Sequence, residues 1–116
     1  MTKNNYQPGD IVLIKLNKSK SSVIINKKRP AVIVSNSDIT RTSQHLHVIP
    51  LTTSNNKNRY SSHVKFTRNG TTNTALCEQV TCVPTQDIEK TDDWVSRLTM
   101  NRIKTCLKNV FDINWK

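Results

Sequence analysis

Two residues carry side chains that could bind a phosphate. One comes just before an apolar run, and the other just after the next apolar run along the chain. Arg29 precedes Pro30 at the start of one run, and Thr52 follows the next run along the chain. An arginine guanidinium is planar, stays charged and can hold a phosphate through two parallel hydrogen bonds. A threonine hydroxyl can donate to the same group. If neighbouring strands bring these side chains together, the pair would suit gripping and cleaving a phosphodiester.

One reaction that such a pair could support is cleavage of RNA through its own 2′-hydroxyl. A catalyst must help remove the hydroxyl proton, stabilise charge on the phosphoryl oxygens and protonate the 5′-oxygen that leaves. Hydrogen-bond donors directed at developing charge commonly contribute about 3 to 4 kcal/mol of transition-state stabilisation. Arg29 would stabilise the charge and could act as the acid, while Thr52 would position the phosphate. The plainer alternative is a solvated arginine before a strand and a threonine in a turn.

The charge of the chain is unevenly distributed. The formal net charge is +10, and Asp38 is the only acid between Ile11 and Cys77. A basic surface of this kind indicates a polyanion partner, with nucleic acid the first choice. The alternative is a solvated surface that binds polyanions without selectivity. The basic residues of this span are Lys15, Lys18, Lys20, Lys27, Lys28, Arg29, Arg41, Lys57, Arg59, Lys65 and Arg68.

The elements that must position Arg29 and Thr52 are strands. Short β-branched runs bounded by turn residues predict strands at residues 11–16, 31–35, 45–51, 62–66, 74–77 and 79–83. Pro30 suits the first residue of a strand, and Asn69-Gly70 predicts a tight turn. Residues 36–43 form a polar connection that could include one helical turn. Residues 17–28 and 55–59 are predicted to be exposed basic loops, and long loops of this kind are often functional.

A change of period marks the C-terminal segment. Apolar residues with helical spacing predict an amphipathic helix over about residues 100–111, capped by Thr99, with Trp94 in a short turn before it. The expected fold is mainly β with this helix appended, a small twisted antiparallel barrel in one domain over residues 1–116. No apolar run is long enough to span a bilayer, and residues 1–8 lack a signal region, so a cytoplasmic location is expected.

The cysteines and histidines offer other chemistries. Three cysteines without paired-ligand spacing favour reduced thiols over a disulfide framework. His45 and His47 would share one face of the third strand, where acid–base catalysis is an alternative to a half-exposed surface. They lack a third ligand with clear spacing, and His63 has no visible partner, so no metal site or cofactor is expected.

The order of the sequence pieces resembles that of the MazF/PemK toxins of bacterial toxin–antitoxin systems. The pieces are Pro-Gly-Asp-Ile-Val at residues 8–12, Arg-Pro-Ala-Val-Ile-Val at 29–34, Val-Ile-Pro-Leu-Thr-Thr at 48–53, Leu-Cys-Glu-Gln-Val at 76–80 and the terminal helix. The resemblance implies an SH3-like, CcdB/PemK-like barrel that forms a homodimer. It also implies a metal-independent, sequence-specific endoribonuclease that cuts single-stranded RNA, mostly mRNA, and so inhibits translation and growth. A cognate antitoxin with an acidic, disordered tail would hold it inactive.

The same resemblance assigns residues. The family's arginine matches Arg29 and its catalytic threonine matches Thr52. Contacts with RNA would come from Lys20, Ser21, Ser22, Lys27, Lys28, Thr53, Glu78 and Gln79. Family members often carry a glutamate in the loop before the Arg-Pro pair, as a candidate general base. Here no carboxylate lies between Asp10 and Asp38, so the proton acceptor is unassigned.

Two readings from other functional classes stay open. The gyrase poison CcdB is similar in architecture, lacks the Arg–Thr site and places a tryptophan near its end, as Trp115 stands here. A non-catalytic RNA-binding barrel would need only the basic charge. Substitution of Arg29 or Thr52 would abolish cleavage by a nuclease, whereas a gyrase poison would depend on Trp115.

Overall fold

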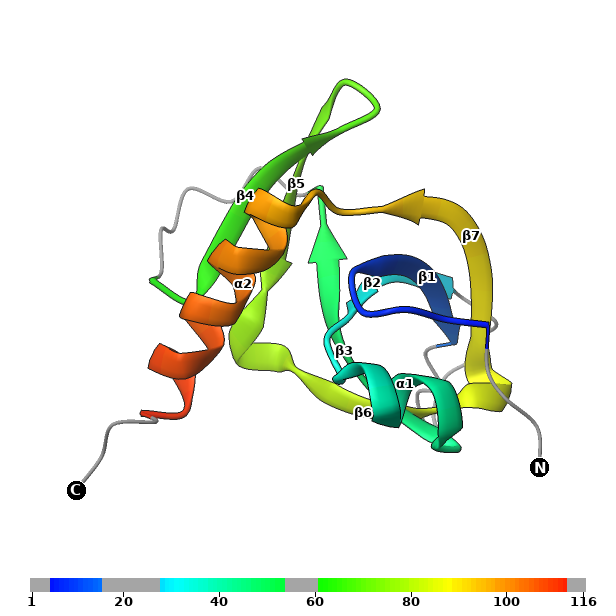
Figure 1. Cartoon of the computed structure of the whole chain (residues 1–116). Coiled ribbons are helices and arrows are strands. Elements are labelled where there is room, and N and C mark those ends of the chain that lie inside the picture. The colour runs from blue at the N-terminus through cyan, green and yellow to red at the C-terminus, as the bar shows by residue number, and fades with distance from the viewer. Residues whose placement is uncertain (1–4, 16–27, 54–60, 113–116) are drawn as a thin grey trace, which may run out of the picture.

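The structure, a computed structural model, describes residues 5–15, 28–53 and 61–112 (Figure 1). Its first half contains β1 (Asp10–Lys15), β2 (Lys28–Ile33), α1 (Ser37–Thr42) and β3 (His45–Thr52). The second half contains β4 (His63–Arg68), β5 (Thr71–Leu76), the 3₁₀ turn η1 (Cys77–Gln79), β6 (Thr81–Pro84), the 3₁₀ turn η2 (Thr85–Asp87), β7 (Ile88–Trp94) and α2 (Arg97–Val110). Within the described residues, no helix has the length and apolar character needed to cross a membrane.

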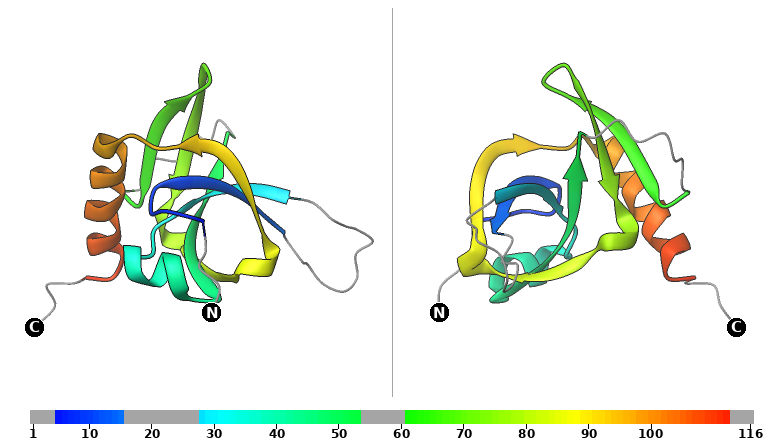
Figure 2. Two further views of the ribbon diagram at one scale, coloured as in Figure 1. Left: turned by 45° about the vertical axis from the view of Figure 1, so that its right-hand side comes forward. Right: turned by 180° about the vertical axis from the view of Figure 1, so that it is seen from behind.

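The strands form one curled antiparallel sheet. They pair in the order β4–β5–β3–β2–β1–β7, and β6 pairs with the first half of β3. The end of β3 leaves β6 and pairs with β5 through Leu51 and Thr52. Figure 2 shows β7, β1, β2, β3 and β6 curling around one interior, while the β4–β5 hairpin extends beyond it. The prediction of a mainly β fold with a C-terminal helix is confirmed.

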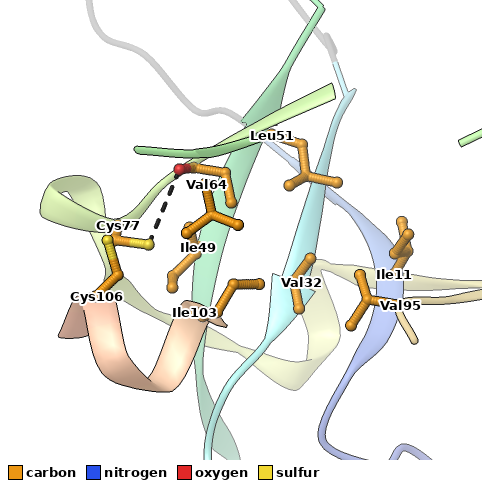
Figure 3. Packing of buried hydrophobic residues seen from close by; sticks show 10 residues of the cluster. Ile11, Val32, Ile49, Leu51, Val64, Cys77, Val95, Ile103 and Cys106 are labelled. Carbon is orange, nitrogen blue, oxygen red and sulfur yellow. Dashed lines mark hydrogen bonds between the residues drawn. The ribbon is translucent and has the colours of Figure 1, made fainter. Parts of the chain in front are cut away.

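Two apolar cores lie on the two faces of this sheet. The first, which we call the helix-side core, packs α2 against β1–β5 (Figure 3) and consists of Ile11, Val32, Ile49, Leu51, Val64, Ala75, Cys77, Val95, Ile103 and Cys106. The second, the barrel core, consists of Val12, Ile14, Ala31, Ile33, Leu46, Val48, Val83 and Ile88. Successive residues of β1, β2 and β3 alternate between the two cores, because side chains alternate along a strand. We call the sheet face that carries the barrel core the barrel face.

Three sequence predictions need correction in the middle of the chain. Pro30 is the third residue of β2, opposite Leu13, and the strand begins at Lys28. β4 begins at His63 and continues to Arg68, where the Asn69-Gly70 turn follows with positive φ at both residues, as predicted. Residues 77–79 form η1, so Cys77 and Gln79 lie on a turn rather than on the two predicted strands.

The helix boundary also differs from the prediction. α2 begins at Arg97 because the Ser96 hydroxyl accepts a hydrogen bond from the Thr99 N–H at 3.1 Å, which makes Ser96 the cap. Thr99 is buried inside the first turn. Trp94 ends β7, a strand that the sequence did not predict, instead of lying in a turn.

A candidate phosphate-binding site at the ends of β2 and β3

The pairing of β2 with β3 brings Arg29 to Thr52. The two strands pair through Ala31 with Pro50, Val32 with Ile49 and Ile33 with Val48. Continuing this antiparallel register by two residues sets Arg29 opposite Thr52. The Arg29 Nε–H donates to the carbonyl oxygen of the neighbouring Leu51 at 3.4 Å, which ties the guanidinium to the end of β3.

Both side chains belong to the barrel face. Arg29 pairs with Ile14 of the barrel core, and residues directly opposite in a sheet share a face. Thr52 lies four residues after Val48 of the same core, so the two side chains point to the same face of β3. Arg29 and Thr52 are only partly buried, whereas Val48 and Ala31 are fully buried. The pair therefore lies where the apolar barrel face opens to solvent.

The charge of Arg29 is available to a ligand. Among the ion pairs of residues 5–15, 28–53 and 61–112, none involves Arg29. Among the described residues, its one side-chain hydrogen bond uses Nε, and the two terminal nitrogens of the fork can bind an anion. A guanidinium beside a threonine hydroxyl at an open strand end can hold one phosphate and stabilise added negative charge on it.

The family comparison decides where this chain belongs. It matches the family described as PemK-like, MazF-like toxins of type II toxin–antitoxin systems over residues 7–111. The chain is a member of that family. A comparison with curated proteins found none that matches this sequence.

Solved structures share the fold of this PemK/MazF-like chain. An endoribonuclease from a mycobacterial species is 19% identical, with 97% of each chain covered and a TM-score of 0.77. A mycobacterial endoribonuclease in complex with its cognate antitoxin is 19% identical, with coverage of 96% of this chain and 99% of that one and a TM-score of 0.78. MazF in a MazE–MazF complex from Deinococcus radiodurans is 13% identical, with coverage of 93% and 96% and a TM-score of 0.77.

The other residues proposed for RNA contact fall in different places. Lys20, Ser21, Ser22 and Lys27 lie outside the described residues. Lys28 precedes Arg29 on β2, and its ammonium pairs with Glu89 of β7 at 2.6 Å. Both partners are about half exposed, so this ion pair stabilises the fold little and can yield to a phosphate. Thr53 is exposed directly after β3, and Gln79 is exposed on η1.

Glu78 of this PemK/MazF-like chain contacts two residues at the start of β4. Its carboxylate accepts a hydrogen bond from the Ser62 hydroxyl at 2.8 Å and lies 3.2 Å from the His63 Nε2. Partial burial alone would raise the pKa of Glu78, but the hydrogen bonds from Ser62, the backbone and His63 outweigh it and hold the pKa below its ordinary value. These contacts favour a structural role. Ser62 and His63 carry no sequence signal for this cluster, because it forms only when β4 pairs with β5.

The remaining histidines do not join Arg29 and Thr52 at the strand ends. His45 and His47 are exposed on the first half of β3, which pairs with β6. Within the described residues, no group of three or more His, Cys, Asp or Glu side chains is placed to hold a metal ion.

Proposed function

We propose that this PemK/MazF family member is an endoribonuclease that cleaves single-stranded RNA at the Arg29–Thr52 site. One observation carries the proposal: the Arg29 Nε–H donates to the carbonyl oxygen of Leu51, the residue before Thr52, while the guanidinium has no ion-pair partner among the described residues. The β2–β3 register, continued two residues beyond the pair Ala31–Pro50, supports the proposal because it would set Arg29 opposite Thr52. Family membership supports it, since these proteins are toxins of type II toxin–antitoxin systems. The solved structures that share the fold include mycobacterial endoribonucleases, which also supports the proposal.

In the proposed reaction, Arg29 and Thr52 hold the scissile phosphate. The RNA 2′-hydroxyl loses its proton to solvent water, and its oxygen forms a bond to the adjacent phosphorus. The bond from phosphorus to the 5′-oxygen breaks, which leaves a 2′,3′-cyclic phosphate, and the 5′-oxygen takes up a proton. Arg29 stabilises the negative charge that builds on the phosphoryl oxygens, and it is the proposed acid. Thr52 donates its hydroxyl to the same phosphate and fixes its position.

The finer features of the proposal come from the family resemblance. The enzyme acts as a homodimer in the cytoplasm, cuts mRNA at a specific sequence without a metal, and thereby inhibits translation and growth. A cognate antitoxin with an acidic tail that folds on binding neutralises its basic surface. The gyrase-poison alternative depends on Trp115, which lies outside the described residues.

Cleavage of a long RNA in EDTA tests the proposal. Wild type should give discrete fragments, and mapping their ends would give the recognition sequence. Arg29→Ala and Thr52→Ala should each slow cleavage by about 10²-fold or more, the usual effect of removing a transition-state donor. Arg41→Ala is the matched control, because Arg41 is exposed on α1 and paired with Asp38. Intact RNA with folded wild type, or equal rates for Arg29→Ala and Arg41→Ala, would overturn the proposal.

A further inference from the structure

Two further side chains lie in line with Arg29 and Thr52 across the sheet. Thr52 pairs directly with Thr74 of β5, and Thr74 pairs directly with Lys65 of β4. Directly opposite residues point to the same face of a sheet. The barrel face therefore carries a row of four residues on four neighbouring strands: Arg29, Thr52, Thr74 and Lys65.

The neighbouring row confirms this assignment of faces. Leu51 pairs with Ala75, and Ala75 pairs with Val64. All three belong to the helix-side core, so their neighbours at Thr52, Thr74 and Lys65 point the other way. The placement of Lys65 thus follows from backbone pairing and core packing, and does not depend on the conformation of its flexible side chain.

The two added residues of this row differ in burial and charge: Thr74 is buried and neutral, whereas Lys65 is exposed and charged. Thr74 is only 7% exposed, so it fills the space between Thr52 and Lys65 without adding charge. Lys65 is exposed on the edge strand, and its ammonium has no ion-pair partner in the part of the chain that the structure describes. The carboxylate of Glu78 is already engaged by Ser62 and His63, and the latter lies two residues before Lys65 on the same strand.

We propose that Lys65 binds a phosphate next to the scissile one, so that this row forms a track for the backbone of single-stranded RNA. The inference rests on the proposed function, because it assumes that Arg29 and Thr52 hold the scissile phosphate. Strands lie about 4.8 Å apart, which places Lys65 roughly 10 Å from Thr52 before its four-carbon stem extends. A lysine contact of this kind positions the backbone and reads no sequence.

Equilibrium binding at several salt concentrations tests the track. The probe is a short single-stranded RNA that contains the cleaved sequence with a 2′-deoxy nucleotide at the cleaved position, so that it binds intact. Lys65→Ala should weaken binding several-fold and lower the slope of log K against log salt by about 0.7, the effect of one phosphate contact in a single strand. Lys104→Ala is the matched control, because Lys104 is exposed on α2, which covers the opposite face of the sheet. Lys65→Arg should restore the slope.

Neutral phosphates locate the contact along the RNA. The phosphates of the RNA are replaced one at a time by neutral methylphosphonate. Wild type should bind the RNA more weakly when the replaced phosphate is the one that Lys65 binds, next to the scissile phosphate. The same replacement should have no effect on Lys65→Ala, because the contact is already lost. In cleavage assays Lys65→Ala should raise KM and leave kcat unchanged, as expected when ground state and transition state lose the same interaction.

Failure of this inference is distinguishable from failure of the proposed function. If wild type cuts RNA but Lys65→Ala and Lys104→Ala show the same salt slope and the same phosphate sensitivity, the track is wrong and the nuclease stands. If wild type does not cut RNA, the proposed function falls, and the inference that rests on it falls too.

Discussion

The guanidinium group of Arg29, which would bind the phosphate, is also hydrogen-bonded to the protein backbone. Its Nε–H donates to the Leu51 carbonyl, so the two terminal nitrogens are directed by a contact with the strand that carries Thr52. A lysine at this position would keep the charge but lose both the tether and the planar fork. Orientation as well as charge is therefore built into the site.

The first prediction follows from this tether. Arg29→Lys should remain folded yet lose most of its activity, with a single-turnover rate closer to that of Arg29→Ala than to wild type. The measurement is RNA cleavage with enzyme in excess, together with circular dichroism to verify the fold. A rate within a few-fold of wild type would show that positive charge alone is sufficient.

The second prediction concerns Glu78. Because hydrogen bonds from Ser62 and His63 hold its pKa in the folded state below the ordinary value near 4.5, its carboxylate stabilises the fold above that pH. This contribution is lost as the pH falls through the lowered pKa. Urea unfolding of wild type and Glu78→Gln should therefore show a difference in stability at pH 7 that shrinks in acid.

A control tests whether the hydrogen bond from Ser62 is part of the cause. Ser62→Ala removes one donor to the carboxylate, so the acid-dependent part of the stability difference should become smaller. A difference between wild type and Glu78→Gln that stays constant with pH would contradict this account of the Glu78 cluster.

Among the secondary-structure elements, the sequence predicts the strands whose side chains are buried on both faces of the sheet. Residues of β1, β2 and β3 face a core on both sides, so they form short continuous apolar runs that indicate buried strands. The Asn69-Gly70 turn is predictable for a different reason, since both residues tolerate positive φ. The amphipathic face of α2 likewise appears directly in the sequence.

β7 was missed because its sequence lacks an apolar pattern. Five of its seven residues, Glu89 to Asp93, are polar or charged, and the strand forms through backbone pairing with β1 at the sheet edge. The site shows the same limit. Arg29 and Thr52 could be named from the sequence, but the alignment of Lys65 with them follows from the pairing of β4, β5 and β3, which local sequence does not encode.

The third prediction tests the observed start of α2. Ser96→Ala removes the acceptor for the Thr99 N–H and should lower the free energy of unfolding by about 0.5 to 2 kcal/mol, the usual value of an N-cap. Chemical denaturation gives the measurement. Thr105→Ala, an exposed change within the same helix, should have little effect; equal losses for the two variants would argue against the cap.

For the whole molecule, the thiols report on the integrity of the fold. Cys77 and Cys106 are buried in the helix-side core, where their side chains lie close together (Figure 3). Burial and the neighbouring Cys106 raise the pKa of the Cys77 thiol to about 12, so it stays protonated and unreactive near neutral pH. Cys82, by contrast, is exposed on β6.

The fourth prediction is the labelling pattern that follows. Iodoacetamide should modify only Cys82 in the native protein and all three cysteines in denaturant, as counted by intact mass. Cys82→Ser should leave the native protein unlabelled. Rapid labelling of Cys77 or Cys106 under native conditions would mean that α2 opens readily from the sheet.

Because β2 and β3 are buried on both faces, a molecule could be folded and still lack a correctly formed site. A shift of β2 by one residue against β3 would exchange Ala31 and Val32 between two cores that both accept apolar side chains. The same shift would carry Arg29 to the opposite side of the sheet from Thr52. Circular dichroism would not distinguish the two arrangements, whereas only one of them keeps Arg29 and Thr52 on the same face, as the proposed reaction requires. Specific activity per folded molecule, rather than yield of soluble protein, is therefore the measure of a correctly assembled sheet.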